Sequence, residues 1–168
     1  MIREIYRNIG NFIFIILLQV LILNNIEFSG FINPYLYLLF ILLLPFETPK
    51  WVLLIVAFIL GLTIDIFSNT LGMHAFATVA IAFLRPYILK IFSPREGYES
   101  GMRPGLQTFG WEWLLKYSVI MVFIHHFILF YIETFKFQMF FSTLLRVILS
   151  TIFTVILIIL SQLLTQKR

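Results

Sequence analysis

Long apolar runs recur along nearly all of this 168-residue chain, and they constrain its fold more than any other feature. Each run approaches the ~20 residues that a helix needs to cross a ~30 Å hydrocarbon core. The composition agrees, because 61% of the residues are hydrophobic, 12% are charged and the mean hydropathy is +0.99. These values exclude an ordinary soluble domain. They predict an all-α, polytopic membrane helical bundle in which residues 1–168 form a single integral membrane domain.

Hydropathy predicts about six spans, at about 9–27, 34–47, 50–67, 71–92, 112–133 and 139–164. The second is short, is bounded by two prolines, and on length alone fits a re-entrant segment as well as a full span. Charge favours the full span, because six crossings from a cytoplasmic N-terminus satisfy the positive-inside rule. Ten basic residues then lie inside or at the inner boundary: Arg3, Arg7, Lys50, Arg85, Lys90, Arg95, Arg103, Lys116, Lys167 and Arg168. Lys136 alone lies outside, so both termini are expected in the cytoplasm.

The segments outside the spans are short, apart from residues 93–110. That segment holds four glycines and two prolines among mixed charges, which is typical of a loop. We expect it to be cytoplasmic, either as a solvated connector or as a docking segment for a partner. The basic N-terminus and the run after it resemble a signal peptide. The following residues, Asn24 to Glu27, offer no small-x-small cleavage site, so the sequence predicts an uncleaved first helix.

Asp65 places a carboxylate inside an apolar span, where a charge normally faces the bundle interior and has a partner. At 1.5 Å per residue it lies about 10 Å below the outer face, and Arg146, His125 and His126 reach the same layer. We predict an intramembrane polar cluster built on an Asp65–Arg146 ion pair, with one histidine adding a hydrogen bond. Because an arginine partner keeps the carboxylate charged, helix association is the favoured role. Proton relay and substrate binding are the alternatives.

Small residues accompany Asp65 on its helix face. Ala57 and Gly61 precede it at successive spacings of four, and this pattern lets another helix approach closely. The next span offers Gly72 and Ala75 on a comparable face. This face is therefore expected either to pack the two spans together or to receive a partner. Ser68 lies in the turn between them, and His74 just beyond it is expected to form a hydrogen bond at the membrane boundary.

Other classes of function have little support in the sequence. There is no HExxH, phosphate-binding glycine loop or GxSxG motif, so no enzyme activity and no cofactor are expected. The chain has no cysteine, and the adjacent histidines lack the spacing of two metal ligands on one helix face, so no metal site is expected. Basic residues are scattered along the inner boundary rather than gathered on a soluble face, which argues against nucleic-acid binding.

The compact spans, the short basic N-terminus and a helical hairpin reading Gly61-x3-Asp65-x2-Ser68-x3-Gly72-x-His74-Ala75 together resemble the bacterial rod shape-determining MreD family. Size and hydropathy agree over the whole chain, whereas the specific part is this hairpin. The resemblance implies a non-catalytic multi-pass scaffold of the elongation machinery for peptidoglycan synthesis, in the bacterial inner (cytoplasmic) membrane. The implied partners are an MreC-like bitopic membrane protein and, indirectly, an MreB-like filament and a RodA/transpeptidase pair.

The same resemblance suggests a fold similar to the substrate-binding subunits of energy-coupling-factor vitamin transporters. The rival function is therefore binding of a small vitamin-like solute by the polar outer layer. Subunits of that class typically dock their coupling partner through an Ala-x3-Ala ridge on the first helix. The first span here, residues 9–27, contains no alanine, which counts against transport.

Overall fold

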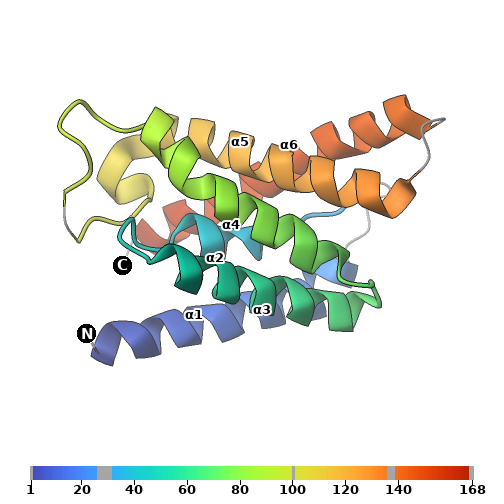
Figure 1. Ribbon diagram of the computed structural model, residues 1–168, viewed down its shortest axis with the longest axis horizontal. Helices are drawn as coiled ribbons and strands as arrows, with labels where there is room; N and C mark the ends of the chain where they lie inside the picture. Colours follow the sequence, from blue (N-terminus) through green and yellow to red (C-terminus); the bar gives the residue numbers. More distant parts are fainter. Residues whose placement is uncertain (1, 26–31, 100, 136–138, 167–168) are drawn as a thin grey trace.

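The computed structural model describes residues 2–25, 32–99, 101–135 and 139–166, and its described backbone is dominated by helices (Figure 1). Five helices are long and apolar enough to cross a membrane, which agrees with the predicted helical membrane bundle. The elements in chain order are α1 (Ile2–Leu21), η1 (Leu23–Asn25), α2 (Leu38–Leu42), α3 (Lys50–Ser68), α4 (Met73–Ile91), α5 (Leu106–Thr134) and α6 (Phe140–Gln166).

The long helices pack as two antiparallel hairpins, α3 with α4 and α5 with α6, joined where α4 lies against α5. α1 runs along one edge beside α3, and both chain termini lie at the same end of the bundle (Figure 1). We call this the termini end, and the opposite end, which holds the turn between α3 and α4, the turn end. The number of membrane crossings and the orientation in the membrane remain predictions.

The second predicted span, residues 34–47, is not a continuous helix. Only α2, five residues long, is α-helical there. The segment nevertheless crosses the bundle interior between α1 and the two hairpins (Figure 1), and its side chains from Tyr35 to Leu39 are buried. Non-helical backbone is tolerated at membrane depth when protein surrounds it and satisfies its polar groups. Hydropathy detected the burial of this segment, but it could not distinguish surrounding protein from surrounding lipid.

Backbone hydrogen bonds of this interior segment are completed by polar side chains from three long helices. Gln19 Oε1 accepts from the Tyr37 amide at 3.3 Å, and Thr154 Oγ1 accepts from the Tyr35 amide at 3.1 Å. At the termini end, Arg85 donates to the Leu42 and Leu44 carbonyls. Polar residues of α1, α4 and α6 thus bind those backbone groups of the segment that its own internal hydrogen bonds leave unpaired.

The hairpin of α3 and α4 turns within four residues. α3 ends where Asn69 adopts a left-handed conformation (φ 53°, ψ 38°), which asparagine tolerates better than most residues. Gly72 (φ 81°) then starts α4. Above the turn the helices almost touch, because a Cβ added at Gly61 would lie 2.5 Å from the Cα of Ala75. Ala57 and Ala75 are also buried, so this small-residue face packs inside the molecule.

The predicted loop at 93–110 is partly helical. α5 begins at Leu106, directly after Gly105, and contains one non-helical residue, Gly110 (φ 77°, ψ 176°). Its first turn is therefore set at an angle to the long remainder of the helix, as Figure 1 shows near the termini end. The aromatic rings of Tyr98 and Phe46 stack at 3.9 Å between centroids and tie the loop to the bundle.

Candidate functional site

Asp65 is buried, with 2% of its surface exposed, and it caps the start of α4. Its Oδ1 accepts the His74 amide at 3.0 Å, and its Oδ2 accepts the Ala75 amide at 2.8 Å. The Thr70 hydroxyl also donates to Oδ1. The first amides of a helix lack internal partners and carry a partial positive charge, so a carboxylate is stabilised there without a cation. Asp65 therefore fixes the geometry of the hairpin.

The predicted Asp65–Arg146 ion pair is wrong. Arg146 belongs to α6, in the other hairpin, and its Nη1 donates to Glu133 Oε2 of α5 at 3.0 Å. Its guanidinium carbon lies over the Phe130 ring, 4.1 Å from the ring centroid. The Asn33 side chain adds a second partner: with its amide oriented toward Arg146, its oxygen accepts from Nη2 at 2.7 Å. Equal depth in the membrane placed Asp65 and Arg146 in one layer but did not determine the rotation of each helix. Glu133 is closer to Arg146 in the sequence than Asp65 is, and the amides of His74 and Ala75 already bind the Asp65 carboxylate.

The two remaining members of the predicted polar cluster, His125 and His126, are fully buried and bind neither Asp65 nor Arg146. His125 Nε2 lies 2.8 Å from the Tyr37 hydroxyl, which also lies 3.0 Å from His74 Nδ1. We assign His125 Nε2–H as donor to Tyr37 and the Tyr37 hydroxyl as donor to His74, since this uses each group once. A tyrosine of the interior segment thus joins two histidines of α4 and α5.

His126 points to a different neighbour, as the 100° between adjacent helical residues requires. Its Nδ1 donates to the Val122 carbonyl at 2.8 Å, and its Nε2 lies 3.4 Å from the Thr154 hydroxyl. The ring of Tyr35 lies between the three histidines, with centroid distances of 4.9 Å to His74, 6.2 Å to His125 and 5.4 Å to His126. All three histidines are therefore gathered around Tyr35 and Tyr37.

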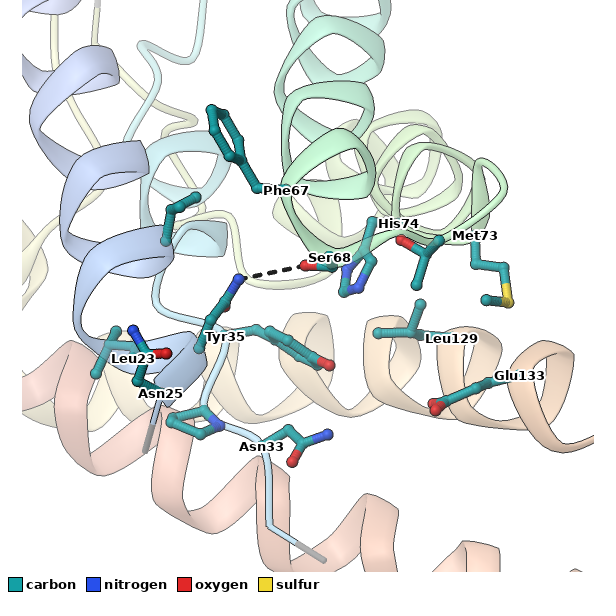
Figure 2. Close-up of a pocket in the computed structure, with 14 residues that line it drawn as sticks. Leu23, Asn25, Asn33, Tyr35, Phe67, Ser68, Met73, His74, Leu129 and Glu133 are labelled. Atoms are coloured by element: carbon teal, nitrogen blue, oxygen red, sulfur yellow. Dashed lines mark hydrogen bonds between the residues drawn. The ribbon is translucent and has the colours of Figure 1, made fainter. Parts of the chain in front are cut away.

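A polar pocket of about 350 Å³ opens beside this cluster at the turn end (Figure 2). Its described polar lining comes from η1, from the residue before the interior segment, from the end of α3 and the turn after it, from the start of α4 and from the end of α5: Asn24, Asn25, Asn33, Ser68, Thr70, His74 and Glu133. Figure 2 shows that Met73, Leu129 and Phe67 add apolar surface to the rim. Residues 26–31 lie outside the described residues. We call this cavity the turn-end pocket.

Amide side chains organise one wall of the turn-end pocket. Gln19 Nε2 donates to Asn24 Oδ1 and to the Pro34 carbonyl, each at 2.9 Å. Asn24 Nδ2 in turn donates to the Ser68 hydroxyl at 3.2 Å, the contact drawn in Figure 2. This chain of hydrogen bonds links α1 to the α3–α4 turn through the interior segment. Ser68 therefore contributes to the wall of the pocket as well as to the turn.

Several residues of this site could not be found from their motifs. Tyr37, Gln19 and Asn24 lie in segments that read as apolar or as loop, and only the presence of a polar group inside an apolar run distinguishes them. Arg85 was expected at the inner boundary, yet 2% of its surface is exposed and it is buried inside the bundle. A cation six residues before the end of α4 was the available sign of that burial.

The arrangement can bind a neutral or weakly charged group, but it offers little chemistry. Among described residues, no group of three histidine, aspartate or glutamate side chains is placed to hold a metal ion. Tyr37 Oη, His74 Nδ1 and His125 Nε2 are occupied with each other. His74, Glu133 and the amides of Asn24, Asn25 and Asn33 are the polar groups that line the pocket. These groups could orient a polar solute or a polar loop of a partner.

Comparisons with known proteins identify no relative of this chain: no family model, no curated protein and no solved structure matches it.

Proposed function

We propose that this chain is a non-catalytic, multi-pass membrane scaffold of the MreD type, acting in the cell-elongation machinery through an MreC-like bitopic partner. The observation that supports this best is that the residues of the hairpin motif make contacts that hold the helices together. Its polar members serve structure: Asp65 caps α4, Ser68 binds Asn24 and His74 binds Tyr37. Its glycines allow a close helix contact and a left-handed turn residue. A motif used in this way favours an assembly protein over an enzyme.

The small-residue face is unavailable to a partner, because Ala57 and Gly61 are fully buried against α4. A bitopic partner must therefore contact lipid-facing surfaces. α1 is the least enclosed long helix, and it exposes 65% of Phe14 and 65% of Leu21. A single transmembrane helix could lie along this face by van der Waals packing. We propose α1 as the contact face for the MreC-like partner.

Complementation tests the proposed function directly. In rod-shaped bacteria depleted of their own MreD, expression of this chain should restore the rod shape. The Gly61→Leu variant, which blocks the close helix contact, should not restore it. Ile66→Leu is the control on the same helix, because 67% of the Ile66 surface is exposed and the substitution adds no atom to the contact with α4. Round cells despite membrane insertion of the wild-type chain would contradict the proposal.

Crosslinking tests the partner separately. The chain has no cysteine, so photo-reactive or cysteine probes at Phe14 and Leu21 report without background. These probes should crosslink to a co-expressed MreC-like protein, whereas a probe at buried Leu60 should not. Crosslinks only from the exposed side chains of α6, such as Phe141, would move the contact face away from α1.

The turn-end pocket supports a second candidate, a subunit that binds a vitamin-like solute. Its volume of about 350 Å³ and polar lining suit a small polar molecule, and ligand sites commonly combine such features. Purified protein should then gain thermal stability with one member of a vitamin panel. The Asn33→Leu variant should lose that gain, whereas Asn25→Leu at the rim should lose less. No stabilisation by any member of the panel would leave the scaffold as the better proposal.

A further inference from the structure

A second cavity, of about 230 Å³, lies at the termini end between the start of α3 and the end of α4. It is far from the turn-end pocket, and the scaffold role leaves it unassigned. Three cationic side chains line it, Lys50, Arg85 and Lys90, together with the hydroxyl residues Thr48 and Ser93. We call it the cationic pocket. No aspartate or glutamate appears in its lining among the residues that the structure describes.

Arg85 brings a buried positive charge to the cationic pocket. Its Nε donates to the Tyr117 hydroxyl at 3.1 Å, and Nη2 donates to the carbonyls of Leu42 and Leu44. These partners are neutral, and no carboxylate within the described ranges binds the guanidinium. The dipoles stabilise the charge but leave it uncompensated. A buried charge of this kind usually has a counter-ion, so the pocket lacks one negative group.

Lys50 and Lys90 lie at the mouth of the cationic pocket. Both are exposed, and Lys50 Nζ lies 5.7 Å from the centroid of the Tyr87 ring, which holds it on the α4 side. Lys50 is also the first residue of α3, whose N-cap, Pro49, provides no side-chain hydrogen bond. The first amides of that helix add partial positive charge beside the two lysines. An anion at the mouth would meet all of these groups together.

The surroundings of the cationic pocket indicate the source of that anion. Trp51, Tyr87 and Ile91 flank the mouth in sequence and are 68%, 53% and 78% exposed. Exposed tryptophan and tyrosine at a helix end are typical of the headgroup layer of a bilayer. The lysines offer hydrogen-bond donors at that level, while the adjacent apolar side chains suit acyl chains; the Thr48 and Ser93 hydroxyls donate to the Pro45 and Pro94 carbonyls. Basic pockets between transmembrane helices are known to bind anionic headgroups.

Tyr98 closes the inner side of the cationic pocket. Its hydroxyl donates to the Leu89 carbonyl at 2.8 Å, and partial burial raises the pKa of Tyr98 above its ordinary value. The phenol therefore stays protonated and neutral and adds no negative charge that would repel an anion. The stacked ring of Phe46 holds it in place.

We propose that the cationic pocket binds the phosphate of an anionic phospholipid, with Lys50 and Lys90 contacting the headgroup and Arg85 supplying fixed charge behind it. The occupied site would join α3, α4 and the interior segment through one lipid. The choice of phosphate chemistry rests on the charges of the pocket, and the choice of a lipid over a soluble anion rests on its aromatic, membrane-level rim.

The test measures lipid retention by native mass spectrometry of the purified full chain. Phosphatidylglycerol and phosphatidylcholine with the same acyl chains are added in equal amounts. The wild type should retain phosphatidylglycerol preferentially. Each surface cation contributes about 1 kcal/mol, or about fivefold, to anionic-lipid binding. The Lys50→Gln/Lys90→Gln double variant should therefore retain about 25-fold less phosphatidylglycerol.

Two controls separate charge from folding and from non-specific attraction. Lys116→Gln removes an exposed lysine of α5 that pairs with Glu112 outside the pocket, and it should leave retention unchanged. Lys50→Arg/Lys90→Arg keeps both charges and should retain the lipid. Equal loss from Lys116→Gln and from the double Gln variant would overturn the proposal. Displacement of the lipid by millimolar glycerol 3-phosphate would also overturn it and assign the site to a soluble phosphate.

Discussion

Asp65 and Arg85 are buried charges at opposite ends of the bundle, and both must be stabilised without an ion pair. Each is a buried charge with 2% of its surface exposed, and neither has an ionic partner among the described residues. Asp65 binds the first amides of α4, where the helix dipole is positive. Arg85 binds carbonyls at the end of α2, where unsatisfied oxygens accumulate. Backbone dipoles stabilise both charges.

The difference between the two sites is the distance along the chain. The partners of Asp65 lie five to ten residues away, in the α3–α4 turn and at the start of α4. The partners of Arg85 lie 32 to 43 residues away, on α5 and the interior segment. Asp65 therefore stabilises local structure and Arg85 stabilises long-range packing. Substitution at Arg85 should loosen the whole bundle, whereas substitution at Asp65 should loosen one hairpin.

The largest effect is expected from Gly61→Leu, which perturbs the hairpin at Ala75, a residue whose amide Asp65 binds. The new Cβ would lie 2.5 Å from Ala75 Cα and 2.7 Å from Ala75 N, the amide that Asp65 binds. Overpacking against backbone should cost about 4 kcal/mol of unfolding free energy, measured by SDS titration in mixed micelles. Gly10→Leu should be nearly neutral. Equal tolerance of both would refute close packing of the hairpin.

Arg85→Met tests the long-range contacts that Arg85 makes with α5 and the interior segment. The substitution leaves the Leu44 carbonyl without its donor and removes the donor to the Tyr117 hydroxyl, whereas Leu42 keeps the bond from Tyr117; the loss should cost about 3 kcal/mol in the same titration. Arg95→Met in the exposed loop is the control and should change little. Hydrogen exchange should rise in both α2 and α5. A rise confined to α4 would contradict the long-range role of Arg85.

Asp65→Asn should cost less, about 2 kcal/mol, because an amide oxygen can still accept one of the three bonds. The exchange of α4 amides near His74 and Ala75 should rise, while α2 stays protected. Glu112→Gln, which removes an exposed carboxylate, should leave the stability of the protein unchanged. Greater exchange in α2 than in α4 would make Asp65 a long-range residue like Arg85.

Asn69→Ala should give the smallest effect, about 1 kcal/mol, because alanine is less stable at the positive φ of 53° that ends α3. Asn69→Gly carries no such penalty and should match the wild type. The two variants remove the same side-chain amide, so their difference isolates backbone conformation. A larger loss for Asn69→Gly than for Asn69→Ala would show that the amide, not the conformation, matters in this turn.

Local patterns in the sequence predicted local structure well. Apolar runs located the five long helices, and the spacing of Ala57, Gly61 and Ala75 anticipated a close approach of α3 to its neighbour. Depth arithmetic grouped four ionisable residues in one layer; Asp65, His125 and His126 are buried, whereas Arg146 is partly exposed. These inferences succeed because helical periodicity and bilayer thickness act on each segment separately.

Partner choice could not be read from the same patterns. Rotation of each helix decides whether Asp65 meets Arg146 or a backbone amide, and rotation depends on packing across the whole bundle. The second predicted span, residues 34–47, is not a continuous helix, and hydropathy could not show this for a related reason. Hydropathy scores Leu38 and Ile41 as membrane residues, although protein rather than lipid surrounds them. Thr154, which supports that segment, is recognisable only once its path is known, whereas Gln19 is marked in the sequence as a polar residue inside an apolar run.

The interior segment also constrains how the chain is made. Its helical portion has five residues, far fewer than the ~20 that a nascent helix needs to partition into lipid by itself. Insertion would therefore begin with the long helices, and the segment would enter only when Gln19, Arg85 and Thr154 are present to receive its backbone. Because Thr154 lies in the last helix, the final contacts would form only near the end of synthesis. A chain truncated before α6 should leave this segment accessible to aqueous labelling reagents.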